Sequence, residues 1–252
     1  MTALCVLTAL WQRHAVAEAV LRHTAEVKAQ LAGDVDLHLV AVGSEGKVSQ
    51  QLAERHGFYY VEAPNAPLSD KWNAGMVRAR DIAAVTKALG VLIVGSDDIV
   101  TAGIFRAAAE AMKSGALVWG CIDMHYAERG PKVIFWPGYS GDRAGDTIGC
   151  GRTLSSKMLQ LCGWNPWPSG LPRSLDYHMM KRLNTLTRER NLFVATSMVE
   201  ASGRMVDLKV DAAVDMSKFA AYEKVGEVVD LDAVLCDVSP MTLEAVRQLL
   251  AP

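Results

Sequence analysis

The sequence predicts an α/β domain built around a mostly parallel central sheet. Short apolar runs alternate with segments of helical spacing through the first half of the chain. The run VLIVG at 91–95 is apolar on both faces, which is typical of a strand in the middle of a parallel sheet. At 252 residues, half of them hydrophobic, the chain is long enough for one large domain with a buried core.

Strands and helices are expected to alternate from the N-terminus. We expect strands at 3–10, 35–42, 58–63, 91–95 and 116–122, and helices at 14–32, 47–56, about 69–89 and about 101–113. Ser69 or Asp70 can cap the third helix. This order is that of a doubly wound sheet, whose ligands lie beyond the carboxyl ends of the strands.

The alternation stops in the second half of the chain. Residues 123–151 are rich in Gly, Pro and aromatic residues and predict hairpins and loops. Two helices near 152–162 and 175–187 flank a stiff loop with two Trp and three Pro. Strands at 192–197 and 205–210 and a helix at 241–250 complete the chain.

The net charge and the cysteine content point to no particular partner. A formal net charge of -2 gives no general attraction to nucleic acid or to an anionic membrane. The five cysteines form no CxxC pair, which favours free thiols in a reducing cytoplasm. No apolar run approaches the ~20 residues that cross a bilayer, so we expect a cytoplasmic protein without a membrane span. The oligomeric state is left open.

Two adjacent carboxylates follow the predicted central strand. Asp97 and Asp98 stand at its carboxyl end, where they would repel each other unless a cation lies between or beside them. Mg²⁺ is commonly held by one or two carboxylates together with substrate phosphates. The alternative is that one of them only caps the helix that starts near Thr101.

Lys71 and Asn73 stand at a predicted helix start, in LSDKWNAGM. Free backbone N–H groups, the helix dipole and an ammonium group all favour an anion such as a diphosphate. The alternative is an ordinary capped helix with a solvated lysine, in which Gly75 allows close packing on the sheet.

Asp176 stands at the start of another predicted helix, in SLDYHMMKRL. Its carboxylate can be the helix N-cap or a general base that faces an acceptor hydroxyl. His178 is a candidate metal ligand, although a lone histidine on a helix is more often structural or solvated.

Together these segments resemble the GT-A glycosyltransferases, and within them the family-2-like group. The matching stretches are DKWNAG at 70–75, VGSDD at 94–98 and LDYHMMKRL at 175–183. The resemblance implies a Rossmann-like sandwich, the nucleotide-diphospho-sugar transferase fold. Gly95 stands where the family has the first Asp of its Asp-x-Asp motif, so Asp97 alone occupies the second, metal-binding position.

The resemblance also implies a domain layout and a set of site residues. The catalytic domain would span 1–190, with a nucleotide-sugar half at about 1–122 and an acceptor half at about 123–190, and 191–252 would be an extension packed on it. Mn²⁺ or Mg²⁺ would be held by Asp97, with His178 as a further ligand, and Asp176 would be the catalytic base. The donor residues would be Thr8, Ala9, Leu10, Arg13, Ser44, Glu45, Lys71, Asn73, Ser96, Asp97 and Asp98, and the acceptor residues Trp164, Trp167 and Arg173.

The function implied by the resemblance is metal-dependent transfer of a sugar from a UDP- or GDP-type donor to an acceptor hydroxyl, with inversion. The acceptor is left open among a glycan, a small molecule and a hydroxymethylated DNA base. One alternative is a sugar-phosphate nucleotidyltransferase, but its expected Gly-rich loop after the first strand is missing from TALWQRH. The other is a non-catalytic binding protein that retains the fold, which Gly95 favours.

Overall fold

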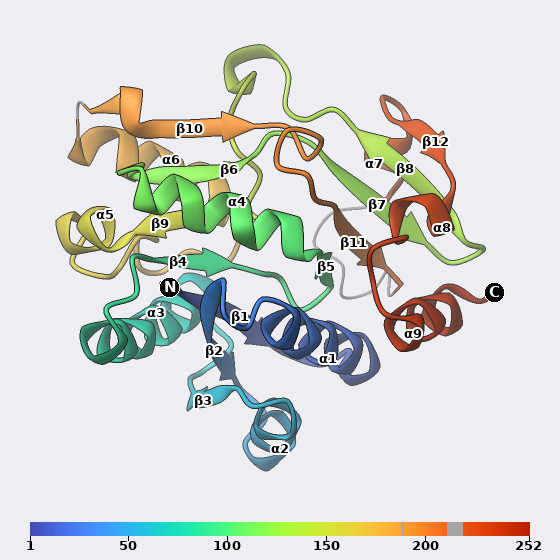
Figure 1. Cartoon of the computed structure of the whole chain (residues 1–252), viewed down its shortest axis with the longest axis horizontal. Coiled ribbons are helices and arrows are strands. Elements are labelled where there is room, and N and C mark those ends of the chain that lie inside the picture. The colour runs from blue at the N-terminus through green and yellow to red at the C-terminus, as the bar shows by residue number, and fades with distance from the viewer. Residues whose placement is uncertain (188, 211–218) are drawn as a thin grey trace.

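Two β-sheets organise the chain (Figure 1), and the computed structural model describes residues 1–187, 189–210 and 219–252. Residues 188 and 211–218, within the predicted catalytic domain and C-terminal extension respectively, lie outside the described part. The strand order is β10-β6-β9-β4-β1-β2-β3 in the seven-stranded sheet and β12-β8-β7-β11-β5 in the five-stranded sheet.

The seven-stranded sheet comprises β1 (Thr2–Leu10), β2 (Val35–Gly43), β3 (Tyr59–Glu62), β4 (Gly90–Ile93), β6 (Val118–Cys121), β9 (Thr153–Ser155) and β10 (Phe193–Thr196). The five-stranded sheet comprises β5 (Asp98–Val100), β7 (Met124–Glu128), β8 (Lys132–Trp136), β11 (Met205–Lys209) and β12 (Glu227–Val229). The helices are α1 (His14–Gln30), α2 (Lys47–Arg55), α3 (Leu68–Thr86), α4 (Ala102–Lys113), α5 (Ser156–Leu161), α6 (Leu175–Leu186), α7 (Phe219–Glu223), α8 (Leu231–Val234) and α9 (Pro240–Leu250), with 3₁₀ turns η1 (Gly141–Arg143) and η2 (Arg190–Leu192).

The seven-stranded sheet is mostly parallel, as predicted. The pairs β1–β2, β1–β4, β2–β3 and β6–β10 are parallel, whereas β9 runs antiparallel between β4 and β6. The predicted helix at 152–162 is therefore wrong over its first residues. Thr153 and Leu154 pair with strands on both sides, and α5 begins only after Ser155, whose hydroxyl accepts from the Met158 N–H at 3.1 Å. The hairpin expected within 123–151 is present as β7 and β8.

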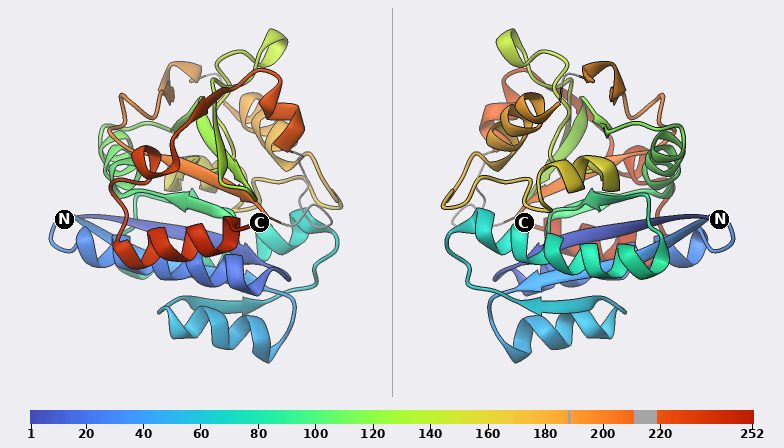
Figure 2. Two further views of the ribbon diagram at one scale, coloured as in Figure 1. Left: turned by 90° about the vertical axis from the view of Figure 1, so that its right-hand side faces the viewer. Right: turned by 90° about the vertical axis from the view of Figure 1, so that its left-hand side faces the viewer.

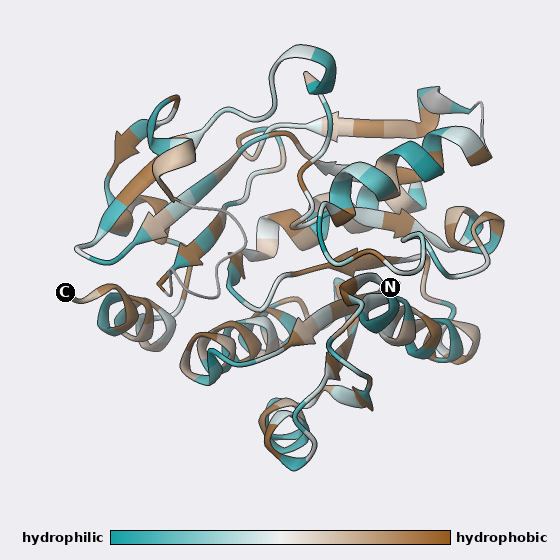
Figure 3. Ribbon diagram, turned by 180° about the vertical axis from the view of Figure 1, so that it is seen from behind, coloured by the Kyte–Doolittle hydropathy of each residue, from teal (hydrophilic) through white to brown (hydrophobic). Residues whose placement is uncertain are grey.

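Apolar side chains cover both faces of the seven-stranded sheet. Along β1, Leu4 and Val6 belong to one apolar cluster, and Cys5 and Leu7 belong to another on the opposite face. Helices α1 and α4 cover the first face, and α3 and α5 cover the second (Figure 2). The hydropathy colouring in Figure 3 shows the matching pattern, with apolar strands at the centre of the sheet.

The C-terminal helix α9 packs along α1 (Figure 2). Ser239 and Thr242 hydroxyls both donate to the Glu26 carboxylate at 2.8 Å, which fixes the start of α9 on α1. Within the described residues, no helix is both long enough and apolar enough to cross a membrane.

The carboxyl ends of β1, β2 and β4 meet at one edge of the parallel sheet. The five-stranded sheet begins at this edge, because β5 follows β4 after a turn and pairs with β11 in antiparallel orientation. The Leu208 N–H also donates to the Asp97 carbonyl at 2.8 Å. The fold thus brings a strand from the distant end of the chain against the tip of the central strand.

Candidate functional site

Three aspartates meet where the two sheets join. Asp97 follows β4, Asp98 begins β5, and Asp207 lies opposite Asp98 on β11. Each offers a carboxylate oxygen, and these oxygens lie within 4.8 Å of one another. Asp98 turns back to accept the Gly95 N–H at 2.7 Å, whereas Asp97 is partly exposed. Like charges this close need positive charge nearby.

The chain itself supplies cations beside these carboxylates. Arg13 NH1 lies 2.9 Å from Asp97 Oδ2, and Lys209 Nζ lies 2.5 Å from Asp207 Oδ2 and 3.8 Å from Asp97 Oδ2. Gln12 and Arg13 both have left-handed backbone conformations, with φ of 52° and 45°. Such geometry is costly outside glycine, so the fold holds this loop in place against Asp97.

Burial and mutual repulsion perturb the titration of this cluster. Burial, reinforced by the charge of Asp97, raises the pKa of Asp98 to about 7. Burial and Asp97 raise the pKa of Asp207 as well. Burial disfavours the Lys209 ammonium, but the surrounding carboxylates outweigh it and raise the Lys209 pKa above its usual value. Lys209 therefore remains a cation within the cluster.

A cleft of about 490 Å³ opens beside Asp97. Arg13, Lys71, Asp97 and Lys209 all line it, together with the partly exposed Trp11. Lys71 Nζ donates to the Leu10 carbonyl at 2.6 Å and to Asn65 Oδ1 at 2.9 Å. Its burial lowers the Lys71 pKa to about 8. The cleft thus combines positive charge with partly exposed carboxylates.

A second chamber of about 230 Å³ adjoins this cleft. The two share four lining residues: Trp72, Gly95, Asp176 and Asp207. The remaining walls of the chamber are largely aromatic and aliphatic, with Tyr126, Tyr139, Trp167 and Tyr222 among them. A carboxylate at Asp176 therefore stands between two compartments.

Asp176 is held in place by the segment 147–152. Arg152, which has no exposed surface, donates from NH1 to Asp176 Oδ1 at 3.3 Å and from Nε to Thr147 Oγ1 at 2.9 Å. A Cβ added at Gly149 would lie 2.3 Å from Asp176 Oδ1, so glycine allows the carboxylate to approach the backbone. The N-cap interpretation of Asp176 is wrong, because Ser174 is the N-cap of α6.

Asp70 and Ser69 are likewise not helix caps. Pro67 is the N-cap of α3. The Leu171 N–H donates to Ser69 Oγ at 2.9 Å, and the Gly170 N–H donates to Asp70 Oδ1 at 3.2 Å. Asn73 donates to the Trp167 carbonyl at 2.9 Å. This face of α3 therefore fixes the Trp/Pro loop.

The other residues predicted for donor binding fall into two groups. Ala9 and Ser96 line the cleft, whereas Thr8 is buried within β1. Glu45 is engaged by the neighbouring loop, accepting the Gln12 N–H at 2.9 Å and lying 3.1 Å from the His14 ring. Ser44 and Glu45 are not among the described residues that line the cleft.

The residues predicted for acceptor binding are also divided. Trp167 is buried and lines the chamber, and its ring lies 5.5 Å from that of Trp72. Trp164 packs in the core. Arg173 is exposed and is not among the described residues that line the chamber. His178 packs edge-on against Tyr177 and does not belong to the acidic cluster formed by described residues.

Four residues that face or support the site had no recognised sequence signal. Asp207 and Lys209 lie on β11, in MVDLK, where alternation predicts a strand and nothing more. Trp72 lies inside the matched DKWNAG stretch and lines the cleft. An aromatic residue next to Lys71 could have indicated a wall of the site. Arg152 precedes a strand that the sequence did not predict.

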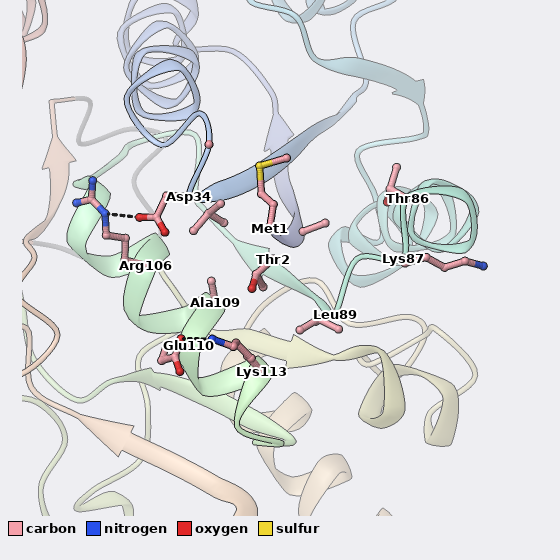
Figure 4. Close-up of a pocket in the computed structure, with 13 residues that line it drawn as sticks. Met1, Thr2, Asp34, Thr86, Lys87, Leu89, Arg106, Ala109, Glu110 and Lys113 are labelled. Atoms are coloured by element: carbon pink, nitrogen blue, oxygen red, sulfur yellow. Dashed lines mark hydrogen bonds and ion pairs between the residues drawn. The ribbon is translucent and has the colours of Figure 1, made fainter.

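A hollow of about 780 Å³ lies at the opposite end of the parallel strands (Figure 4). It is lined by Met1, by solvated Lys87, and by Arg106, whose guanidinium pairs with Asp34 at 3.0 Å. The acidic cluster, Lys71 and Asp176 lie at the other end of the sheet. This hollow therefore carries none of the chemistry described above.

Replacing Gly95 by alanine is expected to destabilise the fold by about 1–3 kcal/mol, the usual cost of overpacking. The added Cβ would lie 2.4 Å from Asp98 Oδ2 and 3.0 Å from Asp97 Oδ1. Urea unfolding measures the change, with Ser96→Ala as the neighbouring control. Unchanged stability would show that the chain has room for a side chain here, and that packing is not the reason for glycine.

Comparison with known proteins gives the fold of this chain. No protein-family model and no curated protein sequence matches it. Among solved structures, the glycosyltransferase TarS of S. aureus (residues 1–349) superposes with a TM-score of 0.50 at 13% identity, over 82% of this chain and 58% of that one. This chain thus spans less than two thirds of the TarS fragment.

Two further structures are similar. The 4-diphosphocytidyl-2C-methyl-D-erythritol synthase of Anaerococcus prevotii, a nucleotidyltransferase, has a TM-score of 0.50 at 11% identity, over 89% of this chain and 94% of that one. Glucosyl-3-phosphoglycerate synthase of Mycobacterium tuberculosis gives 0.48 at 15% identity, over 77% and 69%. The two superpositions at a TM-score of 0.50 show the fold alone at 13% and 11% identity, and it is GT-A-like, as the sequence motifs indicated.

Proposed function

We propose that this chain, which has the GT-A-like fold, transfers a sugar from a nucleotide-sugar to an acceptor hydroxyl in a metal-dependent reaction. The observation that carries the proposal is the joint placement of Lys71, Arg13 and Asp97 on one cleft, beside a chamber that shares Asp176 with it. Cations and carboxylates in one cleft suit a metal-bridged diphosphate, and the shared carboxylate suits a general base.

The chemistry of the acidic cluster fits a divalent cation. Asp97, Asp98 and Asp207 offer hard oxygen ligands within 4.8 Å of one another, which Mg²⁺ and Mn²⁺ prefer. When bound, the cation would supply Lewis-acid stabilisation of the leaving diphosphate. Arg13 and Lys209 line the same cleft and would add positive charge for the phosphate oxygens.

Asp176 would accept the proton of the acceptor hydroxyl. Arg152 fixes one carboxylate oxygen at 3.3 Å, which orients the group while the rest of the side chain lines both compartments. Attack from the chamber side, opposite the departing diphosphate, would invert the configuration of the anomeric carbon. The nucleotide would be of the UDP or GDP type, with its base toward Trp11, whose partly exposed ring can stack on a base.

The second candidate function is nucleotidyl transfer. The nearly full-length superposition with the nucleotidyltransferase favours it, since the two chains are of similar extent. The β1–α1 loop argues against it, because TALWQRH contains no glycine and folds over Asp97 through Arg13. A binding protein without activity would keep the cleft and lack turnover.

Incubation with a panel of nucleotide-sugars, with and without Mn²⁺, tests the proposal. Metal-dependent release of free nucleoside diphosphate supports sugar transfer, with water acting as a slow acceptor. Pyrophosphate release from a nucleoside triphosphate and a sugar phosphate would instead support nucleotidyl transfer. Binding of nucleotide-sugars without either product would support the binding protein.

Binding of UDP is expected to weaken as the pH rises through about 8. Burial lowers the Lys71 pKa to about 8, so its ammonium is lost above that pH, and with it the attraction for the diphosphate. Calorimetry between about pH 7.5 and about pH 8.5 measures the affinity, since the diphosphate is already ionised there and the uracil ring is still neutral. Lys71→Met should bind more weakly at about pH 7.5 and lose the pH dependence, and the same slope in both proteins would exclude Lys71.

A further inference from the structure

The walls of the 230 Å³ chamber have an unusual composition. They combine aromatic rings with three carboxyl groups, those of Asp98, Asp176 and Asp207, and none of the described wall residues is a lysine or arginine. The adjoining cleft differs, because three cations, Arg13, Lys71 and Lys209, line it beside its carboxylates. The two compartments therefore suit ligands of different charge.

The aromatic walls are held in fixed positions by their contacts. Tyr126 and Tyr222 stack with centroids 3.6 Å apart, and the Trp136 ring meets both of them edge-on, with centroids at 5.9 and 5.4 Å. On the other side, Trp72 packs against Trp167 at 5.5 Å. Rigid aromatic faces offer apolar contact to a flat or ring-shaped ligand at low entropic cost.

The carboxyl groups determine which polar groups a ligand must carry. An ionised carboxylate only accepts hydrogen bonds, so a ligand has to donate them through hydroxyl or amine groups. The chamber therefore offers acceptors and flat apolar faces together.

The cations near the chamber are already paired. Arg152 is fully buried against Thr147 and Asp176, and Lys209 bonds Asp207 at 2.5 Å. Arg143 lies over the Tyr139 ring at 3.5 Å and pairs with Asp146 at 3.0 Å. A phosphate or carboxylate placed in the chamber beside Asp176, apart from the cluster that would hold the metal, would thus meet a carboxyl group without a compensating cation among the described wall residues.

The size of the chamber limits its occupant. Its 230 Å³ lies below the range of pockets that enclose drug-sized ligands, roughly 300–1,000 Å³, and suits a single ring with its substituents. Asp176 lies in the wall that the chamber shares with the cleft. A ring hydroxyl that donates to Asp176 would therefore face the donor in the cleft.

We propose that the chamber receives the acceptor as a neutral, hydroxyl-bearing single ring, such as a sugar residue, and rejects phosphorylated or carboxylated acceptors. This inference rests on the proposed function. In the reaction, the acceptor hydroxyl gives its proton to Asp176, and its oxygen forms a bond to the anomeric carbon of the donor. The bond from that carbon to the diphosphate oxygen breaks, and the electron pair leaves with the diphosphate.

Saturation-transfer NMR on the whole protein, with UDP and Mg²⁺ present, tests the selection. The probes are neutral methyl glycosides of common hexoses, each compared with its 6-phosphate and its uronic acid. Neutral members should bind at least about tenfold more tightly than their anionic counterparts. Equal or tighter binding of the anionic members, or no binding by any neutral member, would overturn the proposal.

A charge placed on the chamber wall sharpens this test. Leu175 lines the chamber at the start of α6 and is only partly buried. Leu175→Lys should bring sugar 6-phosphates to within about tenfold of the neutral glycosides or better, because it adds the missing cation. Leu175→Gln, of similar size and without charge, should keep the discrimination. The same relaxation in both variants would assign the selection to shape.

The acceptor and the sugar of the donor are both neutral rings, so either could occupy the chamber. The variant Tyr222→Ala distinguishes these two occupants. Loss of the aromatic wall should weaken neutral glycosides about tenfold and leave the affinities for UDP and UDP-glucose unchanged. A selective loss of UDP-glucose affinity would show that the chamber holds the donor sugar and overturn the acceptor assignment. Failure of UDP to bind wild-type protein would overturn the proposed function. In that case, the comparison of neutral and anionic sugars without UDP still tests which ligands the chamber selects.

Discussion

Replacing Asp176 by asparagine is expected to lower nucleotide-sugar turnover by about 10² to 10⁴, the usual contribution of a general base. Asparagine has nearly the same shape, so it keeps its place against Gly149 and can still accept the hydrogen bond from Arg152. It cannot take up a proton. The affinity for UDP should remain unchanged, because Asp176 faces the cleft from the side shared with the chamber.

Initial-rate kinetics and calorimetry together measure both parts of this result. Asp81→Asn serves as the matched control, since Asp81 is exposed on α3 and pairs with its neighbour Arg80. Full turnover in Asp176→Asn would direct attention to another carboxylate of the chamber. Loss of UDP binding would assign Asp176 to the donor rather than to the acceptor.

Replacing Asp97 by asparagine is expected to weaken Mg²⁺-dependent binding of UDP by at least about a hundredfold, since even indirect metal partners contribute 10–100-fold. Asp97 lines the cleft beside Arg13 and Lys71. Asp207 lines it too, but its carboxylate already pairs with Lys209. Asp98, in contrast, is turned back toward the Gly95 N–H. The amide has lost the charge that a hard cation requires.

The metal-free protein provides the internal control for this variant. Without Mg²⁺, Asp97→Asn should bind UDP at least as well as wild type, because a negative charge has gone while Arg13 and Lys209 remain. Calorimetric titrations with and without Mg²⁺ give all four affinities. Equal Mg²⁺ dependence in both proteins would remove Asp97 from the metal site.

The first half of the fold was predictable because its signals are local. The run at 91–95 and the helical spacing of 14–32 define β4 and α1 within one or two residues at most boundaries. Strand β9 was missed because its three residues carry no pattern of their own, and they become a strand only by pairing with β4 and β6. Such pairing between distant segments leaves no trace in a local window.

The candidate site divides along the same line. Lys71, Asp97 and Asp176 stand at element ends that the sequence marks, and the fold brings all three to the rim of one cleft. Asp207 and Lys209 enter the site only because β11 pairs with β5. The alternating pattern of a strand predicts which residues share a face, but the partner strand depends on the whole topology.

Lys209 also bears on the charge balance of the acidic cluster when no ion is bound. Its ammonium and the Arg13 guanidinium offset two of the three aspartate charges at the joint between the two sheets, and burial favours the neutral form of the third, Asp98. An exchangeable ion is then not needed as a structural brace. Under the proposed function, the ion would arrive and depart together with each nucleotide, and the fold would not depend on it.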